Sequence, residues 1–275
     1  MQSLQRLRLY GTTSARLALR GRGVRRAEAP SGRLIFVVGA PRSGTTFLGS
    51  SLGAQPGLVD LGEVQPLKAA IPALVELPAA EAARAIRRIL ERVRALAGLR
   101  RVRGVEQTPE TSFLVPVLLD AYPEASVVHI VRDGRDVAAS LLERGWLSSA
   151  RGGRDDARAA YGPHARFWVE PERAGEFVQA SDATRAAWAW RRYVAAARAP
   201  EVARRSEIRY EELVTSPAEV AKRLAADLEL DPAPLAAALS QAHGRSVGNF
   251  QRLSAQELAD IEREAGPLLR ELGYG

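Results

Sequence analysis

The sequence predicts an α/β domain with a central parallel sheet flanked by helices. Short aliphatic runs alternate with longer segments of helical periodicity, which is the pattern that parallel strands and their crossover helices produce. Two runs, residues 34–38 (LIFVV) and 126–131 (SVVHIV), are too short for helices and rich in β-branched residues, as buried parallel strands are. A chain of 275 residues is long enough for one such domain with insertions.

The remaining elements follow in the same alternating order. Residues 78–99 carry an apolar stripe at helical spacing under an outer face of arginines, which predicts a long amphipathic helix. Pro109 marks a boundary between a strand and a helix. We expect strands at 34–38, 58–61, 103–106, 126–131 and 207–210, and helices at 45–52, 78–99, 111–122, 137–144, 183–199, 216–228 and 254–272.

A glycine-bounded loop, residues 39–46 (GAPRSGTT), joins the first strand to its helix. A strand, a tight glycine turn and a helix start direct backbone N–H groups and the positive end of a helix dipole at an anion, most often a phosphate. The spacing from Gly39 to Gly44 matches the nucleotide-binding P-loop, but Thr45 stands where the P-loop has its lysine. The cation is Arg42, inside the loop. An ordinary strand-to-helix turn is the alternative.

A second cationic group follows the strand at 126–131. In open parallel sheets, ligands bind outside the carboxyl ends of the strands, so Arg132 is expected in the same crevice as the loop. Ser140 and Arg144 share one face of the next helix. A nucleotide hydrolase would carry an acidic residue near here to hold Mg²⁺. The pattern therefore predicts a ligand with two separate phosphate sites and no metal.

The formal charge of +7 is concentrated at the N-terminus, because residues 1–30 hold +6 and the rest of the chain only +1. A nearly neutral body is not expected to bind nucleic acid. We interpret residues 1–32 as a basic, flexible arm. A targeting presequence and a segment lying on an anionic membrane surface, giving peripheral membrane contact, are the alternatives.

Cysteine is absent, which excludes disulfides, thiolate metal sites and cysteine nucleophiles. The three histidines, His129, His164 and His243, are too scattered in the sequence for a metal cluster. No apolar run approaches 18 residues, so we expect a soluble protein without a spanning helix. Together these features favour a cytoplasmic, bacterial-type protein.

Three motifs in order identify a resemblance to a known family. They are APRSGTTFL at 40–48, VVHIVRDGRDVAAS at 127–140 and IRYEELVTSP at 208–217. The chain from about 33 to 274 resembles the sulfotransferases that use 3′-phosphoadenosine-5′-phosphosulfate (PAPS). It is most similar to the branch with tyrosylprotein and bacterial carbohydrate or small-molecule sulfotransferases. The resemblance implies a P-loop-like sulfotransferase domain at 33–275 that transfers a sulfuryl group from PAPS to an acceptor hydroxyl.

The resemblance also implies roles for individual residues. Those around the 5′-phosphosulfate would be Arg42, Ser43, Gly44, Thr45 and Thr46. Arg132 and Ser140 match the pair that grips the 3′-phosphate, Arg144 matches a further contact there, and Tyr210 matches a residue close to the adenine. Residues 245–252 occupy the place where the family closes over the nucleotide. The product would be adenosine 3′,5′-bisphosphate, and no metal is implied.

An acceptor that loses a proton needs a general base. Glu63, after the short run 58–61, lies where this branch has its catalytic glutamate; Glu106 is the second choice, and His129 is expected to be structural. Arg42 would share catalysis by neutralising charge on the leaving phosphate. The chain departs from the family at Gln107, where many members have a lysine that assists the leaving group.

The acceptor is not specified by these patterns. Residues 145–182 are rich in glycine, arginine and aromatic residues, and we expect them to form an acceptor-site or lid insertion for a phenol, a sugar, another small molecule, a lipid-linked glycan or a peptide. Two other function classes stay open. One is a nucleotide kinase or NTPase using the same loop, and the other is a non-catalytic nucleotide-binding protein on the same fold.

Overall fold

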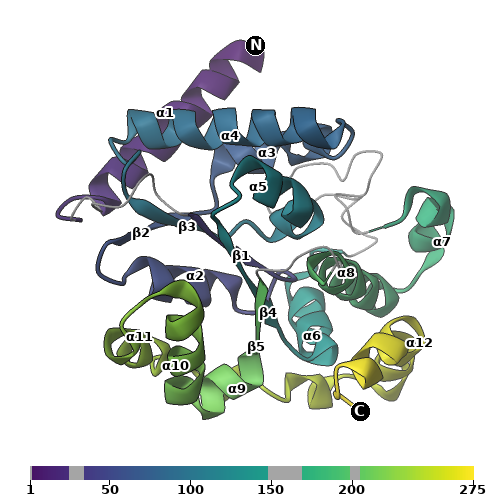
Figure 1. The fold of residues 1–275 in the computed structure, drawn as a ribbon. Helices are drawn as coiled ribbons and strands as arrows, with labels where there is room; N and C mark the ends of the chain where they lie inside the picture. Colours follow the sequence, from purple (N-terminus) through teal and green to yellow (C-terminus); the bar gives the residue numbers. More distant parts are fainter. Residues whose placement is uncertain (1, 25–33, 148–168, 199–204) are drawn as a thin grey trace.

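The computed structural model describes residues 2–24, 34–147, 169–198 and 205–275. A five-stranded sheet runs through the centre of the molecule, in the order β2-β3-β1-β4-β5 (Figure 1). Its strands are β1 Leu34–Val38, β2 Leu58–Gly62, β3 Arg103–Glu106, β4 Ser126–Val131 and β5 Arg205–Arg209. All the pairings are parallel, so the carboxyl ends of the five strands lie at one edge of the sheet.

Helices cover the sheet in three groups (Figure 1). The first contains α1 Gln2–Arg20, α3 Gln65–Leu74, α4 Ala79–Leu96 and α5 Val115–Ala121. The second contains α2 Thr45–Gly53, α9 Tyr210–Thr215, α10 Pro217–Leu228 and α11 Pro232–Leu239. The third, beyond β4, contains α6 Gly134–Arg144, α7 Ala174–Gln179, α8 Asp182–Ala197 and α12 Ala255–Glu271.

Alternation along the central strand explains the first two layers. Leu34, Phe36 and Val38 of β1 pack into the cluster under α3, α4 and α5. Ile35 and Val37, on the opposite face of the strand, pack into the cluster under α2, α10 and α11. All five side chains are fully buried, as expected for a strand covered on both faces. A third apolar cluster joins α6, α8 and α12 around Trp188, Trp190 and Tyr193.

The predicted fold class is confirmed, and the differences are local. Residues 65–74 form α3, which the sequence patterns did not predict because Pro66 and Pro72 interrupt them. A 3-10 helix, η1 Pro109–Leu114, precedes α5. Tyr210 begins α9 and does not end β5.

Residues 2–24, the described part of the N-terminal segment, differ from the flexible arm that we expected over residues 1–32. Residues 2–20 form α1, which packs against α3, α4 and β2. Tyr10 and Leu17 lie on its inner face with Ser14, at a spacing of four and three residues that places them on one side of a helix. Because we interpreted this segment from its net charge, we did not predict the buried face formed by Tyr10, Ser14 and Leu17. The proposed boundary at residue 32, and residues 148–168 of the expected acceptor segment, lie outside the described residues. Within the described residues, no helix combines the length and apolar composition needed to cross a bilayer.

Candidate functional site

The loop after β1 takes a tight backbone path that depends on glycine at two positions. Gly39 and Gly44 have φ values of 151° and 98°. A Cβ atom on Gly39 would lie 2.4 Å from the carbonyl oxygen of Ile130, and one on Gly44 would lie 2.7 Å from the Tyr210 ring. Arg42 also has a positive φ, 74°, which is uncommon for a residue with a side chain. The loop therefore passes tightly between β4 and Tyr210.

Helix α2 begins at Thr45 in a way that leaves its first N–H groups open. Its N-cap residue is Gly44, so no side chain caps the helix start. The Ser43 hydroxyl next to it is buried and has no hydrogen-bond partner within the described part of the chain. An uncapped helix N-terminus beside an unsatisfied hydroxyl provides hydrogen-bond donors and positive potential for an anion.

Arg132 reaches from the end of β4 across this loop. Its Nη1 donates to the carbonyl oxygen of Arg42 at 3.2 Å, and its Nη2 donates to the carbonyl oxygen of Ser246. The guanidinium also lies 4.7 Å from the centre of the Tyr210 ring and 3.4 Å from the Asp136 carboxylate. These contacts fix a nearly buried cation within reach of the loop.

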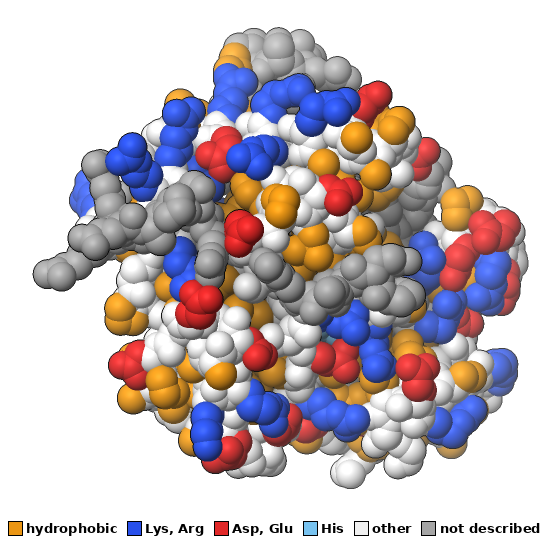
Figure 2. Space-filling view, viewed as in Figure 1, with side chains coloured by type: hydrophobic (Ala, Val, Ile, Leu, Met, Phe, Trp, Pro, Cys, Tyr) orange, Lys and Arg blue, Asp and Glu red, His pale blue; other side chains and the backbone are white. Residues whose placement is uncertain are grey.

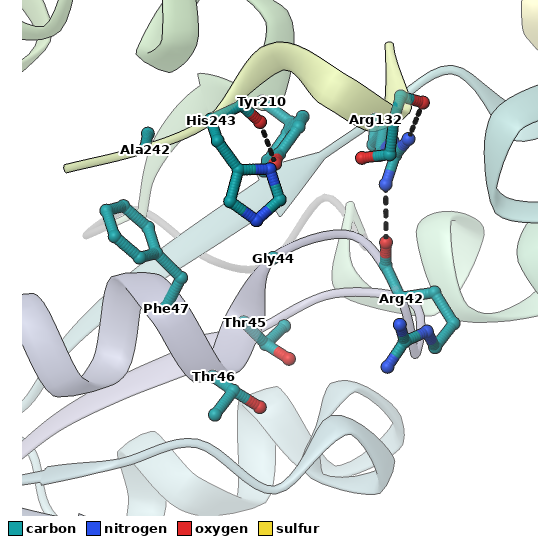
Figure 3. A pocket seen from close by; sticks show the side chains of 10 residues that line it. Arg42, Gly44, Thr45, Thr46, Phe47, Arg132, Tyr210, Ala242 and His243 are labelled. Carbon is teal, nitrogen blue, oxygen red and sulfur yellow. Dashed lines mark hydrogen bonds between the residues drawn. The ribbon is translucent and has the colours of Figure 1, made fainter. Parts of the chain in front are cut away.

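The loop and Arg132 border a cavity of about 240 Å³ (Figure 3). Tyr210 closes one side, and its hydroxyl donates to the carbonyl oxygen of His243 at 3.0 Å. The residues that line the cavity are Arg42, Gly44, Thr45, Thr46, Phe47, Arg132, Tyr210, Ala242, His243 and Ser246. Five of the residues expected to bind a nucleotide therefore share one cavity with Tyr210.

Sequence reasoning did not assign Phe47, Ala242 or His243 to the site, whereas Ser246 belongs to the segment 245–252 that was expected to close over the nucleotide. Phe47 falls within the motif at 40–48, so its position after the loop was a usable signal. Ala242 and His243 follow α11 in a turn, and nothing in their local pattern indicates a cavity. They reach it because the Tyr210 hydroxyl, at the start of α9, donates to the carbonyl oxygen of His243, and Arg132, just after β4, donates to that of Ser246.

Ser140 and Arg144, on α6, lie beside the cavity but do not line it. The Nε of Arg42 donates to the Ser140 hydroxyl at 3.1 Å. Arg42 and Arg144 both lie over the Trp146 ring, at 6.0 and 5.6 Å from its centre. The Arg42 side chain therefore contacts α6, the helix that carries Ser140 and Arg144.

The segment at 244–252 is held to α6 by a buried acid. Both carboxylate oxygens of Asp136 accept backbone N–H groups, from Gly248 at 2.9 Å and from Phe250 at 3.0 Å. The Arg135 guanidinium packs 4.3 Å from the centre of the Phe250 ring. These contacts place the expected closing segment over the Arg132 side of the cavity.

Glu63 follows β2, the edge strand, and is not among the residues that line the cavity. Its carboxylate lies 2.7 Å from the Lys68 amine, which is also 3.6 Å from the Glu110 carboxylate. Its backbone is held by Arg16 of α1, whose Nη2 donates to the carbonyl oxygens of Leu61 at 3.3 Å and Glu63 at 3.1 Å. A positive φ of 62° at Gly62 forms the bend between these two carbonyls.

Glu106, the second choice for a base, lies fully buried at the end of β3. Its carboxylate accepts the N–H groups of Val64 at 3.3 Å and Thr108 at 3.1 Å, together with the Thr108 hydroxyl. Burial raises the pKa of Glu106 to about 7, although the hydrogen bonds from Thr108 and Val64 oppose that shift. Through these hydrogen bonds, Glu106 connects the end of β3 to Val64, the residue that follows Glu63.

His129 is buried in the middle of β4, and its Nδ1 lies 2.9 Å from the Glu207 carboxylate of β5. Burial lowers the pKa of His129 despite that carboxylate.

Gln107 packs against α2, where a Cβ atom on Gly49 would lie 2.9 Å from the Gln107 Cβ. The position where many sulfotransferases have a lysine thus holds a neutral side chain packed against a helix. No group of three or more acidic or histidine residues that could hold a metal occurs among the described residues.

Residues 75–234 match the sequence profile of the sulfotransferase family. This span is more than half of the 275-residue chain. The chain belongs to the sulfotransferase family. The span includes Arg132, Ser140, Arg144 and Tyr210, whereas the loop with Arg42 precedes it. None of the curated proteins matches the sequence.

Solved sulfotransferase structures share the fold. The sulfotransferase domain from the curacin biosynthetic pathway aligns with a TM-score of 0.52 at 16% identity, over 90% of this chain and 99% of that domain. The sulfotransferase domain from the olefin synthase of Synechococcus PCC 7002 aligns with a TM-score of 0.52 at 14% identity, over 90% of this chain and 98% of that domain. At sequence identities this low, the structural alignments establish similarity of fold alone.

Proposed function

We propose that this sulfotransferase moves a sulfuryl group from PAPS to an acceptor hydroxyl. One observation carries the proposal: Arg132 is bonded to the carbonyl oxygen of Arg42 at 3.2 Å and borders the same cavity as the uncapped start of α2. Two positive regions in one cavity suit a nucleotide with two separate phosphate groups. Membership of a family that generally uses PAPS supports the same donor.

The loop is the proposed site of the 5′-phosphosulfate. The N–H groups at the start of α2, the Ser43 hydroxyl and the Arg42 guanidinium are its donors. Transfer of a sulfuryl group, like that of a phosphoryl group, depends on in-line positioning and on neutralising charge on the leaving phosphate. Arg42 can contribute the second of these because its side chain borders the cavity. No metal is part of the proposal.

The other end of the nucleotide is assigned to Arg132 and Tyr210. We assign the 3′-phosphate to Arg132, with Ser140 and Arg144 from α6, and the adenine to the side of the cavity formed by Tyr210 and Phe47. The hydrogen bond from Arg42 to Ser140 links residues that we assign to the two different phosphate groups. A phosphate at Ser140 would compete with Arg42 for the Ser140 hydroxyl.

Glu63 is the proposed general base. An acceptor hydroxyl must lose its proton as the sulfuryl group arrives, and a carboxylate within hydrogen-bond reach can take it. The ion pair with Lys68 and the bonds from Arg16 hold Glu63 at the carboxyl end of the sheet. Glu106 is a poorer candidate because its carboxylate is buried and already accepts three protein hydrogen bonds.

The acceptor, the location and the domain limits are also proposals. We assign a small-molecule or glycan acceptor, and we propose that residues 145–182 contribute to its site in a domain spanning 33–275. The absence of cysteine favours a reducing, cytoplasmic setting.

The test of the donor is direct. The purified protein is incubated with PAPS, a panel of phenols, sugars and peptides, and EDTA, and the release of adenosine 3′,5′-bisphosphate is measured. Acceptor-dependent release is expected. Release that needs Mg²⁺, or phosphoryl transfer from ATP by the same preparation, would contradict the proposal.

A further inference from the structure

The outer faces of α1 and α4, with the turn that follows each helix, form one strongly basic surface, which we call the basic plate. Its arginines are exposed and gather over the upper part of the molecule in Figure 2. They are Arg8, Arg22, Arg84, Arg87, Arg88, Arg92, Arg100 and Arg101. Among the described residues, most of these guanidinium groups form no ion pair.

Charge is segregated on this side of the protein. Residues 7–24 contain four arginines and no acid, and residues 79–103 contain eight arginines and two acids, which gives these two segments a formal charge of +10. The whole chain has +7, so everything else sums to −3. The net charge of the chain outside residues 1–30 is therefore close to zero only because acidic residues elsewhere offset the basic helix α4.

The plate is a folded surface. Tyr10 of α1 is buried beneath Arg92 of α4, whose guanidinium lies 4.8 Å from the centre of the ring. The Ser14 hydroxyl donates to the carbonyl oxygen of Val93 at 3.3 Å, and Leu17 is fully buried. Because these contacts join the two helices, the backbone positions that carry the arginines are fixed relative to one another.

Large apolar side chains are exposed on the same two helices. Leu7 and Leu19 on α1 are 56% and 59% exposed, and Leu96 on α4 is 59% exposed. Arginines with interspersed exposed leucines are typical of helices that lie in the interface of an anionic membrane, where the leucines enter the acyl boundary. Surfaces that bind single-stranded nucleic acids use exposed aromatic residues for stacking, and the aromatic residue of α1, Tyr10, is covered.

We propose that the basic plate binds the surface of an anionic lipid bilayer. Arginines near such a surface are attracted to its negative potential, and the attraction falls within a Debye length of about 8 Å at physiological ionic strength. The plate therefore holds the protein at the membrane with α1 and α4 facing the lipid. This inference is independent of the proposed sulfuryl transfer.

The experiment is co-sedimentation of the full chain with vesicles at 100 mM salt. Vesicles of phosphatidylcholine with 30% phosphatidylglycerol are compared with phosphatidylcholine alone. We expect binding to the anionic vesicles only. A triple variant, Arg84→Gln, Arg88→Gln and Arg101→Gln, should weaken it by about 100-fold, since each arginine near the surface contributes roughly 1 kcal/mol.

A matched control removes the same charge elsewhere. Lys222→Gln, Arg263→Gln and Arg270→Gln change exposed residues of α10 and α12, away from the plate in Figure 1. This control should bind as the unchanged protein does. Equal loss in both triple variants would show net-charge attraction without a defined surface and would overturn the proposal.

Two further experiments distinguish a lipid surface from a nucleic acid as the partner. Leu7→Ser with Leu19→Ser should weaken vesicle binding several-fold without changing the charge. Anisotropy with labelled duplex DNA and single-stranded RNA tests the other polyanion. Nucleic-acid binding without vesicle binding at the same salt concentration would overturn the lipid assignment.

Discussion

Replacing Arg16 by methionine tests whether α1 positions the proposed base. Arg16 lies 45 residues or more from the backbone that it holds, and its Nη2 bonds the carbonyl oxygens of Leu61 at 3.3 Å and Glu63 at 3.1 Å. Methionine keeps most of the apolar stem and removes both bonds. In this variant the carbonyl oxygens of Leu61 and Glu63, on either side of the bend at Gly62, lose the Arg16 guanidinium as their shared hydrogen-bond donor.

The size of the effect follows from these contacts. A hydrogen bond from a charged donor contributes about 1.5–3 kcal/mol, and the longer bond belongs at the low end of that range. Burial lowers the pKa of Arg16, so part of the gain is offset by the cost of desolvating the guanidinium. We expect the free energy of unfolding to fall by about 1–3 kcal/mol. A shift of Glu63 by about 1 Å would lower kcat by up to roughly 10²-fold.

The assay separates positioning from general stability. Unfolding by urea gives the stability, and steady-state turnover with PAPS and calorimetry with adenosine 3′,5′-bisphosphate give kcat and nucleotide affinity. We expect a lower kcat, an unchanged bisphosphate affinity and partial recovery in Arg16→Lys. Arg8→Met, an exposed residue of the same helix, is the control. If Arg16→Met keeps its full kcat while Glu63→Gln loses activity, the positioning role is wrong.

Three other changes test the site. Glu63→Gln should lower kcat by roughly 10²-fold or more and leave bisphosphate binding unchanged, and full activity in this variant would place the base elsewhere. Arg132→Ala should weaken binding of adenosine 3′,5′-bisphosphate by about 10- to 150-fold while adenosine 5′-monophosphate loses little, since the lost interaction is with the 3′-phosphate; equal losses would refute the assignment. Glu106→Gln tests the raised pKa. Protonated Glu106 favours the folded state, so this contribution is present below pH 4.5 and is lost as pH rises through about 7. Urea unfolding from pH 4.5 to 8 should show the parent losing up to about 3 kcal/mol relative to the variant, and parallel profiles would contradict it.

The strands and the glycine loop after β1 could be predicted because local sequence determines them. β1 and β4 are aliphatic runs buried on both faces, and Gly39 and Gly44 occupy backbone positions that a side chain would block. Arg132 could be placed because parallel strands bring their carboxyl ends to one edge of a sheet. These inferences need only short-range pattern and the geometry of the fold.

The parts that could not be predicted depend on contacts between distant segments. The net charge of residues 1–30 indicated a solvated arm, whereas Tyr10, Ser14 and Leu17 pack the segment against α4. His243 reaches the cavity through a hydrogen bond that its carbonyl oxygen accepts from the side-chain hydroxyl of Tyr210, 33 residues away. Gln107 marked a missing cation, and only the structure shows that its side chain packs against Gly49 of α2.

We propose above all that the cavity between the loop and Arg132 accepts a nucleotide with a 5′- and a 3′-phosphate. Isothermal titration calorimetry in EDTA, with adenosine 3′,5′-bisphosphate, adenosine 5′-monophosphate and ATP as ligands, tests it most directly. The structure predicts that the bisphosphate binds at least 10-fold more tightly than the monophosphate, through the contact with Arg132. Tighter binding of ATP, appearing only when Mg²⁺ is restored, would contradict the claim.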